Sequence, residues 1–145
     1  MKNLIVKNVS TLNGHKIDRD GNQFTVKTII PDEEATKCRA NFVEVDPGNY
    51  AYGYHYHEAN EEVFYIISGT GVVRTNDGEI HVKAGDVIAF PAGKKGAHVM
   101  KNESENEKLV YIDFGTTIVP EIVHLPDFNK IMVIGKDVNG VYDKQ

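Results

Sequence analysis

The feature that most constrains this chain is a series of short segments rich in Val, Ile, Tyr, Phe and Thr, separated by turn sequences. Turns such as DPGN (46–49) and NDG (76–78) limit each segment to the length of a strand. Strands that recur at this spacing predict an antiparallel sandwich or barrel. The expected strands are 23–29, 38–45, 50–57, 62–68, 71–76, 79–85, 86–91, 97–102 and 109–115.

The remaining segments carry weaker signals. Residues 30–36 and 126–132 are expected to hold a short helical turn at most, and no long helical period is present. After Pro120, EIVHLP is expected to form one more strand, and the last residues are expected to fray. The 145 residues contain no repeat or low-complexity linker, which predicts a single domain over 1–145, with the tail 116–145 packing on the barrel or on a partner subunit.

Composition excludes several classes of protein. The net charge is −5, and Lys94–Lys95 is the only adjacent basic pair, which is a poor footprint for nucleic acid or anionic lipid. No apolar run approaches the roughly 20 residues of a membrane helix. The N-terminus lacks the apolar stretch and cleavage site of a signal peptide, and Cys38 is the single cysteine. We therefore expect a cytoplasmic protein without an intramolecular disulfide.

Residues 55–62, HYHEANEE, place ionisable groups at the start of an apolar strand. His55 and His57 project to the same face, where two imidazoles could clamp one divalent ion. A carboxylate from Glu61 or Glu62 would add an oxygen ligand, and alternation cannot choose between them because a turn intervenes. Such mixed ligands suit Fe, Mn, Ni, Cu or Zn better than Ca. An H-x-H pair alone is a weak motif, because histidines on a strand are more often ordinary surface or core residues than metal ligands.

The wider pattern resembles the cupin family of small β-barrels. The first cupin motif, a glycine, H-x-H, a glutamate and a second glycine, is matched by Gly48, His55, His57, Glu62 and Gly69. The second motif, a glycine, P-x-G, a histidine and an asparagine, is matched by Gly85, Pro91, Gly93, His98 and Asn102. The resemblance implies an all-β fold, a double-stranded β-helix or jelly-roll barrel, with its motif region at 48–102.

Two spacings depart from the cupin pattern. Six residues rather than five separate Gly48 from His55, and four rather than two separate Gly93 from His98. In an extended chain two added residues keep the same face, so His98 is expected to point inward, with its depth in the barrel left open.

The resemblance also implies a site. Its metal ligands fall on His55, His57, Glu62 and His98, holding one divalent ion such as Fe, Mn, Ni or Zn, whereas Glu61 becomes a rim residue and the candidate catalytic base. The resemblance implies a metalloenzyme of the dioxygenase, isomerase or decarboxylase type that acts on a small polar organic molecule. The alternatives are a non-catalytic barrel that binds a sugar or small metabolite through a metal anchor, and a structural barrel without metal. The expected partner is a small molecule, not a nucleic acid or a membrane.

A stripe of aromatic residues suggests self-association. Tyr50, Tyr52, Tyr54 and Tyr56 alternate along one strand, so we expect them to face away from the histidines, with Gly53 on the metal face. Such an amphipathic surface, together with the edge strands of a small barrel, favours a homodimer.

Overall fold

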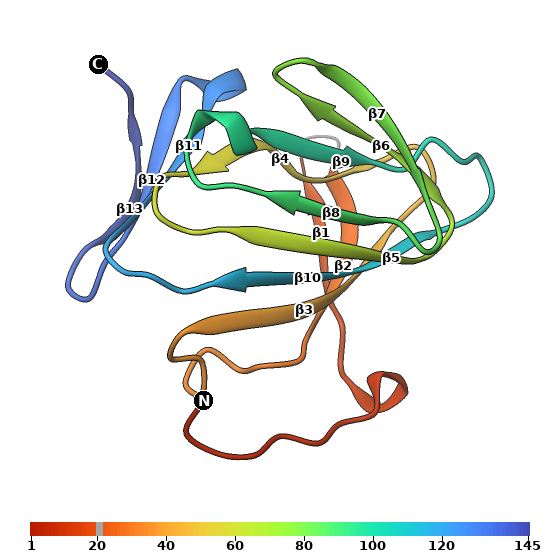
Figure 1. Ribbon diagram of the computed structural model, residues 1–145, viewed down its shortest axis with the longest axis horizontal. Helices are drawn as coiled ribbons and strands as arrows, with labels where there is room; N and C mark the ends of the chain where they lie inside the picture. Colours follow the sequence, from red (N-terminus) through yellow and green to blue (C-terminus); the bar gives the residue numbers. More distant parts are fainter. Residues whose placement is uncertain (20–21) are drawn as a thin grey trace.

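The computed structural model describes residues 1–19 and 22–145 and shows an all-β chain curled into a half-barrel (Figure 1). Within those residues, regular structure consists only of strands and short 3-10 helices. The strands are β1 (His15–Arg19), β2 (Asn22–Thr28), β3 (Cys38–Val45), β4 (Tyr50–His57), β5 (Glu62–Ser68), β6 (Thr70–Thr75), β7 (Gly78–Lys83), β8 (Val87–Phe90), β9 (His98–Lys101), β10 (Leu109–Thr116), β11 (Glu121–Leu125), β12 (Lys130–Ile134) and β13 (Asn139–Asp143). The 3-10 helices are η1 (Val9–Thr11), η2 (Lys94–Gly96) and η3 (Pro126–Phe128).

Two antiparallel layers enclose the core. One layer runs β2-β3-β10-β5-β8, with β1 paired to β2, and the other runs β4-β9-β6-β7. Every second side chain of a strand points between the layers, which gives the strongly alternating burial of β5 and β10. The side chains that meet there include Phe24, Val43, Val45, Ala51, Phe64, Ile66, Val73, Met100, Leu109 and Tyr111.

The nine expected strands are confirmed as β2 to β10, with bounds that differ by no more than about two residues. The strand β1 has no counterpart in the prediction, because HKIDR lacks an apolar alternation. It is held by antiparallel pairing along β2.

The segment after Pro120 is more ordered than its sequence predicts. The strand β11 pairs with the end of β4, as expected for EIVHLP, and β12 and β13 extend this ladder. Asn139–Asp143 pairs with β12 along its whole length, so of the last residues, which were expected to fray, only 144 and 145 lie outside a strand. The expected turn at 126–132 is confined to η3. In Figure 1 these three strands stand at the left, at the end of the half-barrel where β5 begins.

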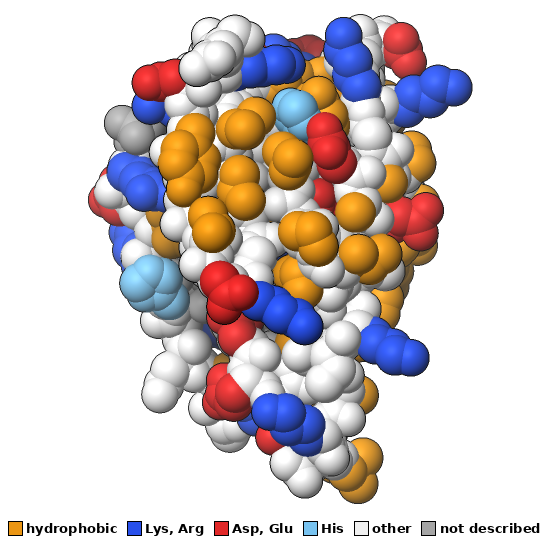
Figure 2. Space-filling view, turned by 90° about the vertical axis from the view of Figure 1, so that its left-hand side faces the viewer, with side chains coloured by type: hydrophobic (Ala, Val, Ile, Leu, Met, Phe, Trp, Pro, Cys, Tyr) orange, Lys and Arg blue, Asp and Glu red, His pale blue; other side chains and the backbone are white. Residues whose placement is uncertain are grey.

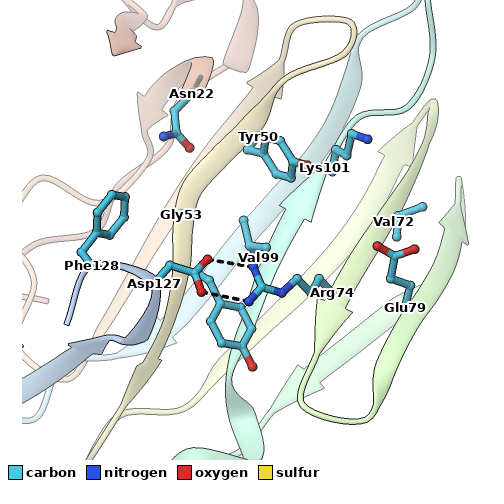
Figure 3. A pocket seen from close by; sticks show the side chains of 11 residues that line it. Asn22, Tyr50, Gly53, Val72, Arg74, Glu79, Val99, Lys101, Asp127 and Phe128 are labelled. Carbon is cyan, nitrogen blue, oxygen red and sulfur yellow. Dashed lines mark hydrogen bonds and ion pairs between the residues drawn. The ribbon is translucent and has the colours of Figure 1, made fainter. Parts of the chain in front are cut away.

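An ion pair fastens η3 to the outer face of the barrel (Figure 3). Arg74 on β6 donates to both carboxylate oxygens of Asp127, at 2.7 and 2.9 Å. The same guanidinium lies 4.1 Å from the centre of the Tyr54 ring. Phe128 follows along η3 and lies beside Gly53 of β4, and these contacts line a hollow of about 260 Å³. The tail is thus anchored at both η3 and β11.

A β-bulge in β4 corrects the prediction of a tyrosine stripe. Ala51 pairs with Met100 and His55 with His98, so β4 has two more residues than β9 between these pairs. Tyr52 and Gly53 take φ values of 67° and 76°, which breaks the alternation of the strand. Tyr52 therefore lies on the histidine side and contacts Phe24 at 4.7 Å between ring centroids. Gly53 lies on the opposite side, next to η3.

Among residues 1–19 and 22–145, no helix combines the length and the apolar character that crossing a bilayer requires.

Candidate metal centre

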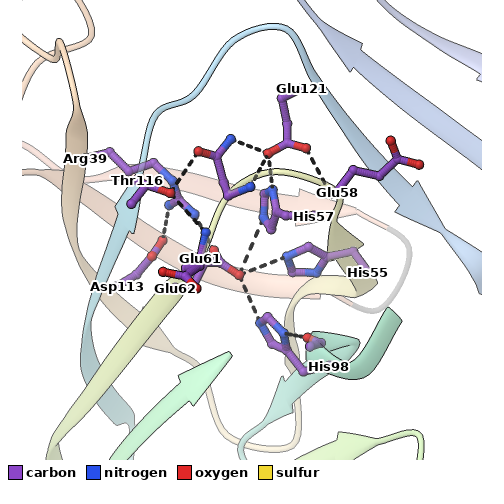
Figure 4. A network of polar contacts seen from close by, with 12 residues as sticks. Arg39, His55, His57, Glu58, Glu61, Glu62, His98, Asp113, Thr116 and Glu121 are labelled. Atoms are coloured by element: carbon purple, nitrogen blue, oxygen red, sulfur yellow. Dashed lines mark hydrogen bonds and ion pairs between the residues drawn. The ribbon is translucent and has the colours of Figure 1, made fainter. Parts of the chain in front are cut away.

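Three strands from the two layers bring the predicted ligands together (Figure 4). His55 and His57 lie two residues apart on β4, and His98 on β9 is the direct cross-strand partner of His55. Glu62 is the first residue of β5 and reaches them from the other layer. The side chains of Glu62 and His98 are almost completely buried, with 4% and 2% exposure.

The three imidazoles converge on one carboxylate oxygen. The Nε2 atoms of His55, His57 and His98 lie 3.7, 3.5 and 3.4 Å from Oε2 of Glu62. One ligand atom each from His55, Glu62 and His98 lies within 4.8 Å of the others, so this buried triad fits a single metal ion.

Backbone carbonyls orient two of the imidazoles. Nδ1 of His55 lies 2.9 Å from the Gly53 carbonyl oxygen, and Nδ1 of His98 lies 2.8 Å from that of Gly96. In the neutral ring these Nδ1–H groups donate to the carbonyls, which leaves the Nε2 lone pairs directed at the centre. The 3-10 helix η2 contains the residues that lengthen the spacing before His98. A turn, rather than added extended chain, therefore returns His98 to the inner face.

Glu121 positions the segment between His57 and Glu62. Its buried carboxylate, on β11, accepts the backbone N–H groups of residues 58, 59 and 60 at 3.0, 3.1 and 2.9 Å. It also accepts the side-chain amide of Asn60 and lies 3.5 Å from Nδ1 of His57. One carboxylate thus fixes the turn and faces the outer nitrogen of an imidazole, the arrangement that orients histidine ligands in metal sites.

Arg39 binds the other carboxylate oxygen of Glu62, Oε1, and also binds Asp113. Nη2 of Arg39 donates to Oε1 of Glu62, and Nη1 donates to Oδ2 of Asp113 at 2.7 Å. Both carboxylates are buried, and the two opposing charges raise the pKa of Arg39 despite its burial. This leaves Oε2 of Glu62 free to face the imidazoles.

The protonation of Glu62 and His98 matches that of a metal site, whereas at His55 a metal ion would compete with a proton. Burial and the neighbouring His55 lower the pKa of His98 to about 4, so its imidazole is neutral at pH 7. Burial alone would raise the pKa of Glu62, but the imidazoles of His55 and His57 beside Oε2 hold it well below its usual range. Burial would likewise lower the pKa of His55, but the Glu62 carboxylate raises it. An ionised carboxylate and neutral imidazoles are the forms that bind a divalent ion.

The chemistry of the donors fits such an ion. Oε2 of Glu62 and Nε2 of His98 face each other at 3.4 Å and are both buried without a hydrogen-bond partner. Buried polar atoms are rarely left unpaired, so their convergence calls for a cation between them. Imidazole and carboxylate donors together suit Fe, Mn, Ni or Zn, and the identity of the ion is not fixed by them.

Glu61 lies outside this cluster. Its side chain is exposed, and its backbone N–H donates to Oγ1 of Thr116 at 3.0 Å while its carbonyl accepts from the Thr116 N–H. Glu61 therefore lies at the rim, as expected, and its catalytic role stays a prediction.

Sequence reasoning missed Arg39 and Glu121, and of Asp113 it predicted no more than a place in the lining of the pocket. Each is a charged residue at an inward-facing position of a strand, in phase with the buried residues Val43, Tyr111 and Val123 respectively. A charge at such a position is the signal that could have identified them, because an unpaired charge is not buried in a core.

Comparison with known proteins agrees with this geometry. Residues 41–115 match the family model described as "Cupin domain". A curated oxalate-binding protein from Thermotoga maritima is 32% identical over 65 residues, which are 45% of this chain and 51% of that protein. The match thus spans about half the length of this curated relative.

Solved structures resemble nearly the whole chain. One protein, from Acidithiobacillus ferrooxidans, has a TM-score of 0.83 at 22% identity and covers 93% of this chain and 87% of its own. A sugar phosphate isomerase from Silicibacter pomeroyi has a TM-score of 0.81 at 20% identity, covering 94% and 91%. A protein from Thermotoga maritima described as a predicted oxalate decarboxylase has a TM-score of 0.69 at 23% identity, covering 79% and 100%. At these identities the likeness establishes the fold.

Proposed function

The chain belongs to the cupin family, and from this premise we propose that it is a metalloenzyme acting on a small organic molecule. His55, His57, Glu62 and His98 would hold one divalent ion. The observation that carries the proposal is the convergence of three Nε2 atoms on the unpaired Oε2 of Glu62. Folding alone gives no reason to bury this set together.

The chain's own residues prepare the site for chemistry. A divalent ion bound there would supply Lewis-acid polarisation of a carbonyl or carboxylate oxygen. Arg39 keeps Glu62 ionised and in place, and Glu121 holds the turn that sets the distance from His57 to Glu62. Tyr52 and Asp113 line the hollow beside the histidines. This environment supports isomerase, decarboxylase or dioxygenase types of reaction, in which an oxygen of the substrate is bound at the centre.

The second candidate is a binding protein in which the ion anchors a sugar or small metabolite. It is favoured by the curated relative named oxalate-binding protein, which matches part of this chain at 32% identity. The same fold hosts enzymes and binding proteins, so the fold does not choose between them.

Turnover separates the two functions. Protein loaded with Fe, Mn, Ni or Zn would be incubated with a panel of hydroxy acids, keto acids, sugars, sugar phosphates and thiols, and products followed by NMR. Metal-dependent conversion of one compound supports the enzyme. A compound that binds tightly and is recovered unchanged favours the binding protein.

The role of Glu61 is tested in the same assay. If Glu61 is the catalytic base, Glu61→Gln should lose turnover while it keeps the metal content of the wild type. Unchanged turnover would remove it from the mechanism.

A further inference from the structure

The hollow above the metal centre has two ends of different character. It has a volume of about 290 Å³. The polar end is formed by Arg39, Tyr52, His55, His57, Glu62 and Asp113, and the apolar end is formed by Val123, Leu125, Met132 and Ile134. The apolar residues all come from β11 and β12, outside the matched cupin region at 41–115.

The strand register places apolar side chains in a row that starts at a histidine. His57 is the cross-strand partner of Val123, Val123 of Met132, and Met132 of Val141. Directly paired residues share one face of a sheet, so these side chains are neighbours. We call Val123, Met132 and Val141 the apolar ladder. It leads from a valine that is 5% exposed beside the centre to one that is 51% exposed at the surface.

The side of the molecule that carries these strands is apolar as well. Figure 2 shows hydrophobic side chains gathered on the side where β11, β12 and β13 lie, with a histidine and acidic side chains among them. Exposed apolar residues of this segment include Ile134, Val138, Val141 and Tyr142. An apolar surface that continues into a pocket is suited to an apolar part of a ligand.

The polar end offers no free cation from the protein. Among the described residues that line the hollow, Arg39 is the only lysine or arginine, and the histidines there are the proposed metal ligands. Its Nη1 and Nη2 are already engaged by Asp113 and Glu62. A phosphate or a second carboxylate on a ligand would therefore meet a guanidinium whose charge two buried carboxylates already compensate, which makes it a poor partner for a further anion.

We propose that the ligand of this site is a small molecule with a pair of chelating oxygens at one end and an aliphatic or aryl group at the other. The chelating end binds at the metal centre, and the apolar group lies along Val123 and Met132, which act as specificity-determining residues. The inference rests on the proposed metal centre and narrows its ligands to molecules without a phosphate group.

A series of hydroxamates tests the inference, because the chelating group is constant and only the tail changes. Protein reconstituted with one equivalent of Zn²⁺ would be titrated calorimetrically with acetohydroxamate, hexanohydroxamate and benzohydroxamate, and with glucose 6-phosphate. Each buried methylene strengthens binding about fourfold. Hexanohydroxamate should therefore bind at least about tenfold more tightly than acetohydroxamate, and benzohydroxamate should also exceed it. Glucose 6-phosphate should bind more weakly than all three.

Matched variants locate the effect. Met132→Gln keeps the length of the side chain and should remove most of the advantage of the longer tail, with metal content and acetohydroxamate affinity unchanged. Val133→Gln changes the neighbouring residue, which projects from the other face of β12, and should keep the advantage. Thermal melting of both variants verifies that they are folded.

The outcomes test the metal centre and the proposed class of ligand separately. If the wild-type protein does not bind Zn²⁺, both the proposed metal centre and this inference are wrong. Zn²⁺ binding with no gain from the longer tail, or tighter binding of glucose 6-phosphate, would overturn only the inference. An advantage that Met132→Gln leaves intact would place the tail elsewhere and remove the apolar ladder as its binding site.

Discussion

At the scale of single residues, Glu121 links the tail of the chain to the metal centre. Its carboxylate accepts three consecutive backbone N–H groups in the turn between His57 and Glu62. It also faces Nδ1 of His57, at 3.5 Å. Because both effects act on how the ligands are placed, Glu121 is a positioning residue rather than a ligand.

The first prediction concerns Glu121→Gln. The amide keeps the shape of the side chain but loses the charge and one acceptor, so metal affinity should fall about 10- to 100-fold. Competition with a chromophoric chelator measures the metal affinity of each variant. The control is Glu58→Gln, since Glu58 is exposed and bonds His124 instead. Equal affinities in Glu121→Gln and the wild type would contradict the positioning role.

The second prediction concerns Arg39→Met in the metal-free protein. Removal of the guanidinium leaves the buried carboxylates of Glu62 and Asp113 without their cation, so the free energy of unfolding should fall by about 3–5 kcal/mol. Denaturant unfolding measures the loss. Arg39→Lys, which keeps the charge, should lose less.

The loss of unfolding free energy in Arg39→Met should increase as the pH rises. Burial already raises the pKa of Asp113 above its usual value of 3.8. A carboxyl whose pKa is raised by folding stabilises the fold when protonated, and this contribution is lost as pH rises through the raised pKa. The deficit of Arg39→Met should therefore be larger at pH 8 than at pH 5. A deficit that does not change with pH would contradict the account.

The sequence predicted the inward-facing histidines because strand alternation and the spacing of two motifs act over a few residues. The sequence did not reveal Arg39 or Glu121, since each meets its partners only through pairing between distant strands. Arg39 and Asp113 are 74 positions apart, and Glu121 is 61 positions from Asn60. The choice of Glu62 rather than Glu61 came from the family spacing alone.

At the scale of elements, local breaks in the strands decide where side chains point. Strict alternation placed Tyr52 away from the histidines, and the bulge in β4 puts it beside them. The bulge lies within the spacing between Gly48 and His55 that is one residue longer than in the cupin pattern.

The expected strands were found because their apolar runs are bounded by strong turns. In β12 and β13, exposed and half-buried residues hide the period, and pairing supplies the order.

The third prediction tests the bulge through Gly53. Its φ of 76° is unfavourable for a residue with a Cβ, whereas the nearest atom to such a Cβ, in the Phe128 ring, lies 3.6 Å away and does not clash. Gly53→Ala should therefore lower the free energy of unfolding by about 1–2 kcal/mol, through backbone strain alone. Gly53→Asn is the matched control, because asparagine tolerates this conformation better. Chemical denaturation that shows no cost for alanine would argue against the bulge.

At the scale of the whole molecule, the outer face of β5, β8 and β10 carries several exposed apolar side chains. Val63, Tyr65, Val87 and Phe114 are exposed there by 38%, 47%, 64% and 43%. Tyr65 pairs with both Val87 and Ile112, so these side chains form rows across three strands. This face takes the place of the tyrosine stripe as the surface that favours a homodimer.

The fourth prediction is therefore a homodimer that depends on this face. Light scattering at micromolar concentration should give the mass of two chains for the wild type, and Tyr65→Glu should shift it toward one. Ile80→Glu, at an exposed residue of β7, is the control and should leave the mass unchanged. A wild-type mass of one chain would remove the homodimer.

The proposed function depends above all on one divalent ion held by His55, His57, Glu62 and His98. Elemental mass spectrometry of the untagged protein, purified without chelator and compared with His57→Ala and His98→Ala, tests it most directly. The account predicts close to one equivalent of Fe, Mn, Ni or Zn per chain in the wild type and a strong loss in both variants. A wild-type protein that takes up no metal, even after incubation with each ion, would contradict it.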